Sequence, residues 1–223
     1  VDTLSSGIIP RRQTRAIQVG AVQIGGGAPV SIQSMTNTDT RDVAATLGQI
    51  NDLAAIGCEI IRVAVPDAAA AAALSQIIAG SPIPVIADIH FDHHLALTAI
   101  DAGIHCIRIN PGTIGNRSHL AAIARRAATA GIPLRVGVNS GSLEREILDK
   151  HGGPTPEAMV ESALRHCEFF EDLGCSQLKV SLKTSTVTST VAAYRLFASA
   201  TDYPLHVGVT EAGTVASGTI KSA

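Results

Sequence analysis

The chain has 223 residues, a formal net charge of −2 and no run of lysines or arginines, which argues against a nucleic-acid or membrane-surface partner. Hydrophobic residues make up 46% and charged residues 16%, a composition typical of a packed globular protein and not of a disordered chain. No apolar stretch approaches the ~20 residues that span a bilayer, and the N-terminus lacks the apolar core of a signal peptide, so we expect a cytoplasmic location.

An N-terminal β-hairpin is predicted first, because Ala16–Gly27 alternates apolar and polar residues around a turn. Seven short apolar strands follow, separated by six helical segments, which is the pattern of successive βα units with a parallel sheet. The expected strands are Val30–Met35, Glu59–Val65, Pro84–Ile89, Cys106–Asn110, Leu134–Asn139, Gln177–Lys183 and Leu205–Val209. The expected helices are Arg41–Ile56, Asp67–Ile78, His93–Ala102, Ser118–Ala130, Thr155–Leu173 and Val187–Thr201.

The strand composition favours a (β/α)₈ TIM barrel. Several strands alternate large β-branched residues with small or polar ones, whereas strands of an open doubly wound sheet are apolar on both faces. A barrel can place polar residues inward near its C-terminal rim, where such enzymes keep their sites. A full barrel has eight strands and typically ~250 residues. We therefore expect an α/β barrel that is truncated after strand seven, with the hairpin covering one end.

Cationic side chains recur on four of the expected strands, and the polar and small residues around them follow at intervals of two, which places each series on one face. The series are Arg62 and Ala64; Arg108 and Asn110; Arg135, Gly137 and Asn139; Lys179, Ser181 and Lys183; and, on the last strand, His206, Gly208 and Thr210. Unpaired in an interior, each cation would cost several kcal/mol, and nearby strand-end acids are few. Because guanidinium groups match phosphate oxygens, the pattern predicts a pocket for a phosphorylated ligand. Alternatively, some arginines face outward or pair with Glu59, Asp67 or Glu211.

Asp88 and His90 have the same two-residue spacing and are candidates for proton transfer or for orienting substrate hydroxyls. Glu211, just past the last strand, is expected either to bind and orient substrate or to form a salt bridge with Arg135 or Lys183. We favour hydrogen bonding over a metal site that would combine Asp88 and His90 with the following histidines. The four cysteines show no C-x-x-C spacing and are expected to be buried thiols: Cys58, Cys106, Cys167 and Cys175.

Several motifs resemble one enzyme family. "SMTNT", "ADIHFD" and "RINPGTIGN" occur in this order, and the similarity extends from Arg11 through "LRVGVNSGSLE", "LKVSLK" and "HVGVTEAG" to "SGTIKSA". The chain resembles the 4-hydroxy-3-methylbut-2-en-1-yl diphosphate synthases of the non-mevalonate route to isoprenoids. Nearly all of the chain is covered without large gaps.

The resemblance implies a barrel that binds 2-C-methyl-D-erythritol 2,4-cyclodiphosphate. The family opens this ring reductively, with loss of water, using electrons that a ferredoxin or flavodoxin delivers through a [4Fe-4S] cluster. By matching motifs, the diphosphate would be held by Arg62, Arg108, Arg135 and Lys183, and the rest of the pocket would be lined by Asp88, His90, Asn139 and Glu211. Ser181, in the same series as Lys183, is a further predicted substrate-binding residue. Asp88, His90 and Glu211 are the candidates for a catalytic role. The resemblance also implies a homodimer.

The sequence departs from the family in three places. Nothing matches the C-terminal domain that carries three cluster cysteines and a glutamate, the eighth strand with its phosphate-binding serine has no counterpart, and Thr184–Thr186 replaces Ala-Ser-Asp or Ala-Ser-Asn. We therefore expect residues 1–223 to form one substrate-binding barrel domain that binds no cluster and is inactive alone. The alternatives are a pterin- or phosphate-binding transferase resembling dihydropteroate synthase, and a non-catalytic, substrate-holding barrel.

Overall fold

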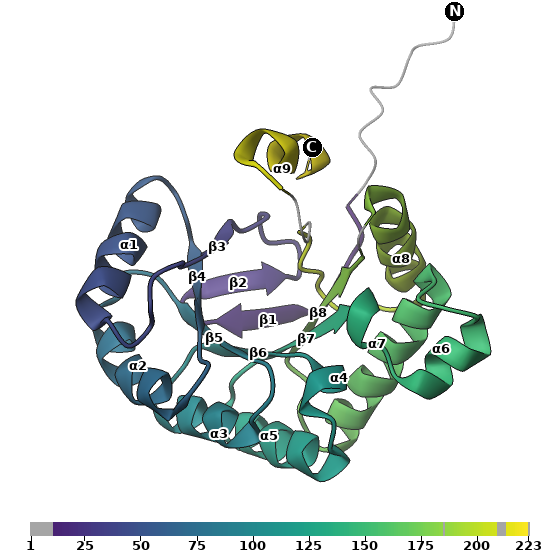
Figure 1. The fold of residues 1–223 in the computed structure, drawn as a ribbon, viewed down its shortest axis with the longest axis horizontal. Helices are drawn as coiled ribbons and strands as arrows, with labels where there is room; N and C mark the ends of the chain where they lie inside the picture. Colours follow the sequence, from purple (N-terminus) through teal and green to yellow (C-terminus); the bar gives the residue numbers. More distant parts are fainter. Residues whose placement is uncertain (1–10, 185, 209–212, 223) are drawn as a thin grey trace, which may run out of the picture.

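The computed structural model describes residues 11–184, 186–208 and 213–222 (Figure 1). Its centre is a six-stranded parallel sheet in the order β3-β4-β5-β6-β7-β8, which curves into an open barrel with helices around its outer face. The strands are β3 (Gln33–Met35), β4 (Ile60–Ala64), β5 (Val85–Ile89), β6 (Cys106–Ile109), β7 (Leu134–Asn139) and β8 (Leu178–Lys183). Six of the seven predicted strands are therefore confirmed.

The seventh predicted strand, Leu205–Val209, is only partly formed in the described residues. Leu205 makes one parallel bridge to Val180, with hydrogen bonds from Val180 N–H to Pro204 O (3.0 Å) and from His206 N–H to Val180 O (2.8 Å). This segment has β8 on one side and no described strand on the other, so its backbone hydrogen bonds to the sheet are made with β8 alone. Val209 lies outside the described residues. The fold is an α/β barrel that is open between this segment and β3.

The six predicted helices are present and cover the outer face of the sheet (Figure 1). They are α1 (Val43–Ala55), α2 (Ala68–Gly80), α3 (His93–Asp101), α5 (Arg117–Ala130), α7 (Pro156–Asp172) and α8 (Val187–Ala200). Four further helical segments were not predicted as separate helices: α4 (Pro111–Ile114), the 3₁₀ turn η1 (Ser140–Ser142), α6 (Arg145–His151) and α9 (Val215–Ser222). Among the described helices, none combines the length and apolarity needed to cross a bilayer.

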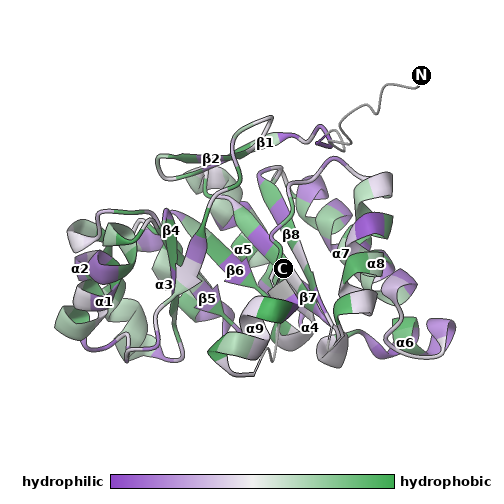
Figure 2. Cartoon of the chain, turned by 90° about the horizontal axis from the view of Figure 1, so that it is seen from above, coloured by the Kyte–Doolittle hydropathy of each residue, from purple (hydrophilic) through white to green (hydrophobic). Residues whose placement is uncertain are grey.

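Successive side chains along each strand point alternately outward, into the core under the helices, and inward, into the interior of the barrel. Outward-facing apolar residues such as Ile61, Val63 and Val136 are fully buried under the helices and form the main core. Inward-facing positions are polar farther along the strands, and Figure 2 shows hydrophilic and hydrophobic segments succeeding one another along β5 to β8. A barrel interior can therefore hold a site while the helices supply the hydrophobic stability.

The hairpin of β1 (Ala16–Val19) and β2 (Val22–Gly25) lies across the N-terminal end of the barrel, as predicted (Figure 2). Val19 is fully buried in a small apolar cluster with Ile60, Ile86 and Cys106, which stand at or near the start of their strands. This cluster closes the floor of the barrel. Polar groups farther along the strands therefore face a space that is open toward the other end and toward the side between β3 and the segment at Leu205.

Candidate functional site

Strand register places the predicted polar residues side by side. Asp88, Arg108, Arg135 and Lys179 are successive partners across β5, β6, β7 and β8. Directly paired residues of a sheet point to the same face, so all four side chains point into the barrel. The two-residue spacing predicted that these side chains face one way, and the register of the strands confirms this. The cations occur in buried strands because they point into the barrel interior and not into the apolar core under the helices.

Asp88 ties two of the arginines together. Arg108 Nη1 donates to Asp88 Oδ1 at 2.9 Å, and Arg62 Nη1 lies 3.4 Å from Asp88 Oδ2. His90 Nε2 lies 2.7 Å from Arg108 Nη1 and 3.4 Å from Asp88 Oδ1. Burial alone would raise the pKa of the Asp88 carboxyl, but the His90 ring and the two guanidinium groups outweigh it, and the pKa lies well below its usual range. Asp88 is therefore a carboxylate that orients cations.

Arg135 and Lys179 have far fewer partners. Arg135 is fully buried and donates from Nε to Ser181 Oγ at 3.1 Å, but its Nη1 and Nη2 have no partner among the described residues. Lys179 is 1% exposed, and its Nζ has no partner there either. Burial, with a contribution from neighbouring guanidinium groups, lowers the pKa of both side chains. Buried cations without partners are costly, so this part of the site is arranged for an anion.

The rim of the site is formed by Asn139 and Lys183, which are register partners at the ends of β7 and β8. Asn139 Oδ1 is buried without a hydrogen-bond partner among the described residues. Burial, and then the charges of Arg135, Arg62 and Arg108, lower the pKa of Lys183 to about 8. The amide oxygen is available to a ligand hydroxyl, and the lysine ammonium is available to a ligand anion.

A cavity of about 720 Å³ lies on the open side of the barrel, and part of this polar network lines it directly. Its lining includes Arg62, Lys179, Lys183 and His206. In the described part of the chain, Asp88 is the carboxylate that forms ion pairs with the inward-facing arginines, and it serves two of them. Positive charge therefore exceeds negative charge around this cavity. Glu211, the other predicted carboxylate, and Thr210 lie outside the described residues.

Sequence reasoning noted the spacing of His206 but gave this residue no role. Its ring lines the cavity, and burial followed by the charges of Arg135 and Lys179 holds the pKa of His206 far below its ordinary value, so the imidazole is neutral. The Tyr194 hydroxyl donates to the carbonyl of His206 and accepts from Leu182 N–H at 3.0 Å. This bridge from α8 fixes the segment against β8, and no sequence pattern could have indicated it.

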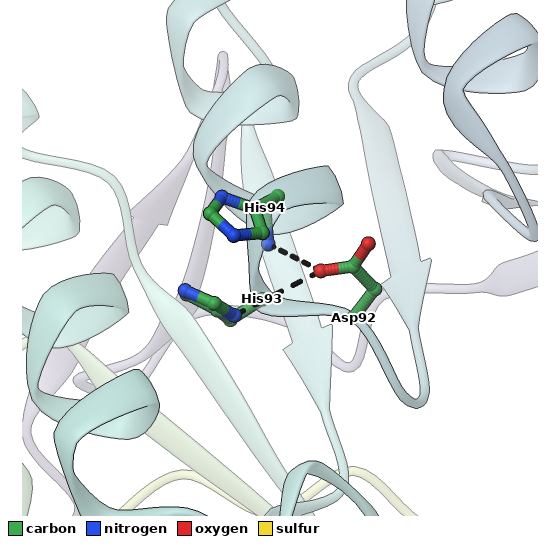
Figure 3. A group of neighbouring side chains, drawn as sticks. All are labelled: Asp92, His93 and His94. Carbon is green, nitrogen blue, oxygen red and sulfur yellow. Dashed lines mark hydrogen bonds and ion pairs between the residues drawn. The ribbon is translucent and has the colours of Figure 1, made fainter.

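His93 and His94 lie apart from this network, at the start of α3, where Asp92 and the two rings gather (Figure 3). One ligand-type atom from each of the three residues lies within 4.8 Å of the others. Asp92 Oδ1 already accepts the His94 backbone N–H at 2.8 Å as the helix cap, and the His93 ring stacks on His119 at 3.7 Å between centroids. These side chains therefore cap and pack the helix, while His90 belongs to the cation site.

The cysteines do not fit an iron–sulfur cluster. All four are free and buried, and among the described residues none belongs to a group of metal-ligand atoms. Burial raises the pKa of the Cys175 thiol to about 12 and also raises the pKa of the Cys106 and Cys167 thiols. Cluster ligands are thiolates that converge on one point, so the thiols described here do not provide such a site.

A family model described as the GcpE TIM-barrel domain matches residues 14–223. The chain belongs to the GcpE family. Two relatives of this GcpE chain are both named "4-hydroxy-3-methylbut-2-en-1-yl diphosphate synthase (flavodoxin)". The relative from Magnetococcus marinus is 56% identical over 216 residues, which are 97% of this chain and 58% of the relative. The relative from Geobacter sulfurreducens is 61% identical over 213 residues, which are 96% of this chain and 60% of the relative. The GcpE chain thus spans less than two thirds of their length.

Solved structures confirm the barrel class of this GcpE domain. A type I 3-dehydroquinate dehydratase from Clostridium difficile superposes with a TM-score of 0.66 at 14% identity, covering 93% of this chain and 84% of that one. A dihydropteroate synthase from Yersinia pestis gives a TM-score of 0.61 at 11% identity, covering 89% and 80% of the two chains. At such low identity these similarities establish the fold alone.

Proposed function

We propose that the cavity of this chain binds 2-C-methyl-D-erythritol 2,4-cyclodiphosphate, with Arg62, Arg108, Arg135 and Lys183 at the diphosphate. The observation that carries the proposal is the excess of buried positive charge, above all Nη1 and Nη2 of Arg135, which have no partner in the part of the chain that the structure describes. A cyclic diphosphate carries about one negative charge on each phosphoryl group and presents several oxygens to guanidinium donors. Ligand binding would therefore satisfy donors that the protein leaves without partners.

The remaining polar groups suit the carbon skeleton of this ligand. Asn139 Oδ1 would accept a hydrogen bond from a substrate hydroxyl, and Ser181 would hold Arg135 in place. Asp88 and His90 contact Arg108 directly, which supports an orienting role for both. The low pKa of Asp88 makes it a poor proton donor near neutral pH. Glu211 stays a predicted pocket residue.

In the whole protein, we propose that this barrel supplies the substrate site for reductive ring opening and dehydration to 4-hydroxy-3-methylbut-2-enyl diphosphate. The names of the relatives support this activity and a flavodoxin as electron donor; a ferredoxin donor and a homodimer rest on the resemblance alone. The redox centre, a [4Fe-4S] cluster in the family, would be bound by residues other than the four buried cysteines. This chain alone is therefore expected to bind substrate without turning it over, even after treatment with iron and sulfide.

The alternative of a pterin-binding transferase is less well supported. A pterin needs a carboxylate that is free to pair with its ring nitrogens, whereas Asp88 is already engaged by two arginines. The fold similarity to dihydropteroate synthase does not carry its ligand over to this chain. A purely substrate-holding barrel would use the same pocket and differs only in what surrounds it.

Calorimetric titration with the cyclodiphosphate tests the proposal. Arg108→Ala and Lys183→Met should each weaken binding at least tenfold, because each removes a charge-assisted hydrogen bond to phosphate. Arg145→Ala is the matched control, since this arginine lies on α6 with a side chain that is 94% exposed. Absence of binding by the unmodified chain, or equal losses in all three variants, would refute the proposed function.

A further inference from the structure

Lys179 belongs to the predicted series of inward-facing cations, but it is not among the residues predicted to hold the diphosphate. It stands four residues before Lys183 on β8 and is therefore deeper in the barrel. Its side chain is almost completely buried, its Nζ has no partner among the described residues, and it borders the cavity. A buried ammonium group without a partner costs free energy in the ligand-free protein, so its presence in this position needs an explanation.

Three other strands, β4, β6 and β7, each place a side chain near Lys179 that does not neutralise the charge of its ammonium group. Arg135 is its register partner on β7, Arg62 faces it from β4, and the Cys106 thiol faces it from β6. The neutral His206 ring approaches from the segment after α8. The nearest groups on its own strand are Ser181 and Lys183, and Ser181 Oγ is engaged by Arg135 Nε. No described carboxylate pairs with Lys179, so an entering anion would be its first counter-charge.

We propose that Lys179 and Arg135, with the His206 ring beside them, form an inner anion subsite that receives one phosphoryl group of a diphosphate while Lys183 and Arg62 hold the other. Three buried donors have no partner among the described residues and would face the anion in this subsite: Nζ of Lys179 and Nη1 and Nη2 of Arg135. The inference rests on the proposed function only in that the same cavity admits the ligand; it concerns which residues hold the deeper phosphoryl group.

Proton uptake follows from this arrangement. Burial lowers the pKa of Lys179 in the ligand-free protein, so above that pKa the amine is neutral. A phosphoryl group beside it favours the ammonium form and raises the pKa again. Between these two pKa values, binding takes a proton from the solvent, and affinity falls as pH rises.

The test compares Lys179→Met, Lys179→Arg and the control Lys150→Met, whose side chain is 59% exposed on α6. Inorganic diphosphate is the probe, titrated calorimetrically in buffers of different ionisation enthalpy. We expect Lys179→Met to lose about tenfold in affinity, a typical effect of one charge-assisted hydrogen bond, and to take up fewer protons than the unmodified chain. Lys179→Arg should retain most of the affinity, and Lys150→Met all of it.

Thermal melting without ligand adds a readout that separates binding from structure. Lys179→Met should melt at or above the temperature of the unmodified chain, because it removes an unpaired buried charge and keeps the volume. Unchanged diphosphate affinity or proton uptake in Lys179→Met, or a lower melting temperature, would overturn the subsite. If diphosphate binding depends on Lys179 but the cyclodiphosphate does not bind, the subsite stands and the proposed function fails. If the cyclodiphosphate binds through Arg108 and Lys179→Met has no effect, the proposed function stands and the subsite fails.

Discussion

Because Gly137 has no side chain, it leaves the space that the Arg108 guanidinium group occupies. A Cβ atom at this position would lie 2.7 Å from Arg108 Nε, closer than real Cβ contacts come, and 3.1 Å from Nη2, which is a tight contact. Gly137→Ala should therefore push the guanidinium away from Asp88 and weaken cyclodiphosphate binding about tenfold or more, as measured by calorimetry.

Gly48→Ala is the control for this change. Gly48 lies in α1 and is exposed, and a methyl group added there would meet no atom within 4 Å. Alanine should leave binding intact at this position and stabilise the helix by about 0.5–1 kcal/mol. Cyclodiphosphate affinity that survives in Gly137→Ala would mean that the position of Arg108 is not important for the ligand.

Single residues also show how far sequence reasoning reaches. The two-residue period was sufficient to place Asp88, Arg108 and Arg135 on one inner face, because strand geometry fixes side-chain direction. It could not show that Asp88 serves two arginines and leaves Arg135 free, because partner choice depends on register between strands distant in sequence. Lys179 and Lys183 belong to the same series, and only burial distinguishes the deep lysine from the one at the rim.

At the scale of elements, the β1–β2 hairpin acts as the floor of the barrel. Val19 is fully buried against Ile60, Ile86 and Cys106. Val19→Ala removes two buried methyl groups and leaves a cavity, so unfolding in urea should show a loss of about 2 kcal/mol. Gln23→Ala, an exposed change on the same hairpin, should stay within about 0.5 kcal/mol of the unmodified chain. Equal stabilities would show that the hairpin is not part of the folded barrel.

The elements that sequence reasoning missed share a physical cause. α4 and α6 have four and seven residues, too short for an apolar period to emerge, and α4 depends on the Asn110 side chain capping Gly112 N–H at 3.1 Å. The long helices were predictable because apolar stripes repeat over three or more turns. The Leu205–Val209 segment carries a strand-like sequence, but in the described residues it is joined to β8 by a single bridge and has no second strand beside it.

At the scale of the whole molecule, the open barrel leaves β3 as an outer strand of the sheet. The residues leading into it are apolar and exposed, with Val30 at 80% and Ile32 at 61%. An outer strand with apolar side chains pairs readily with another chain, and lysine at such a position opposes pairing. We therefore expect this chain to self-associate through the β3 edge, with a mass in light scattering that rises with concentration.

Ile32→Lys should shift this equilibrium toward the monomer, because a charge at the β3 edge would have to be desolvated on pairing. Ile56→Lys is the matched control, since Ile56 is 82% exposed at the end of α1, outside the sheet. Circular dichroism of both variants would verify that the fold is retained. A mass of one chain at every concentration, or equal association of the two variants, would contradict pairing through β3 and would mean that the open barrel is stable by itself.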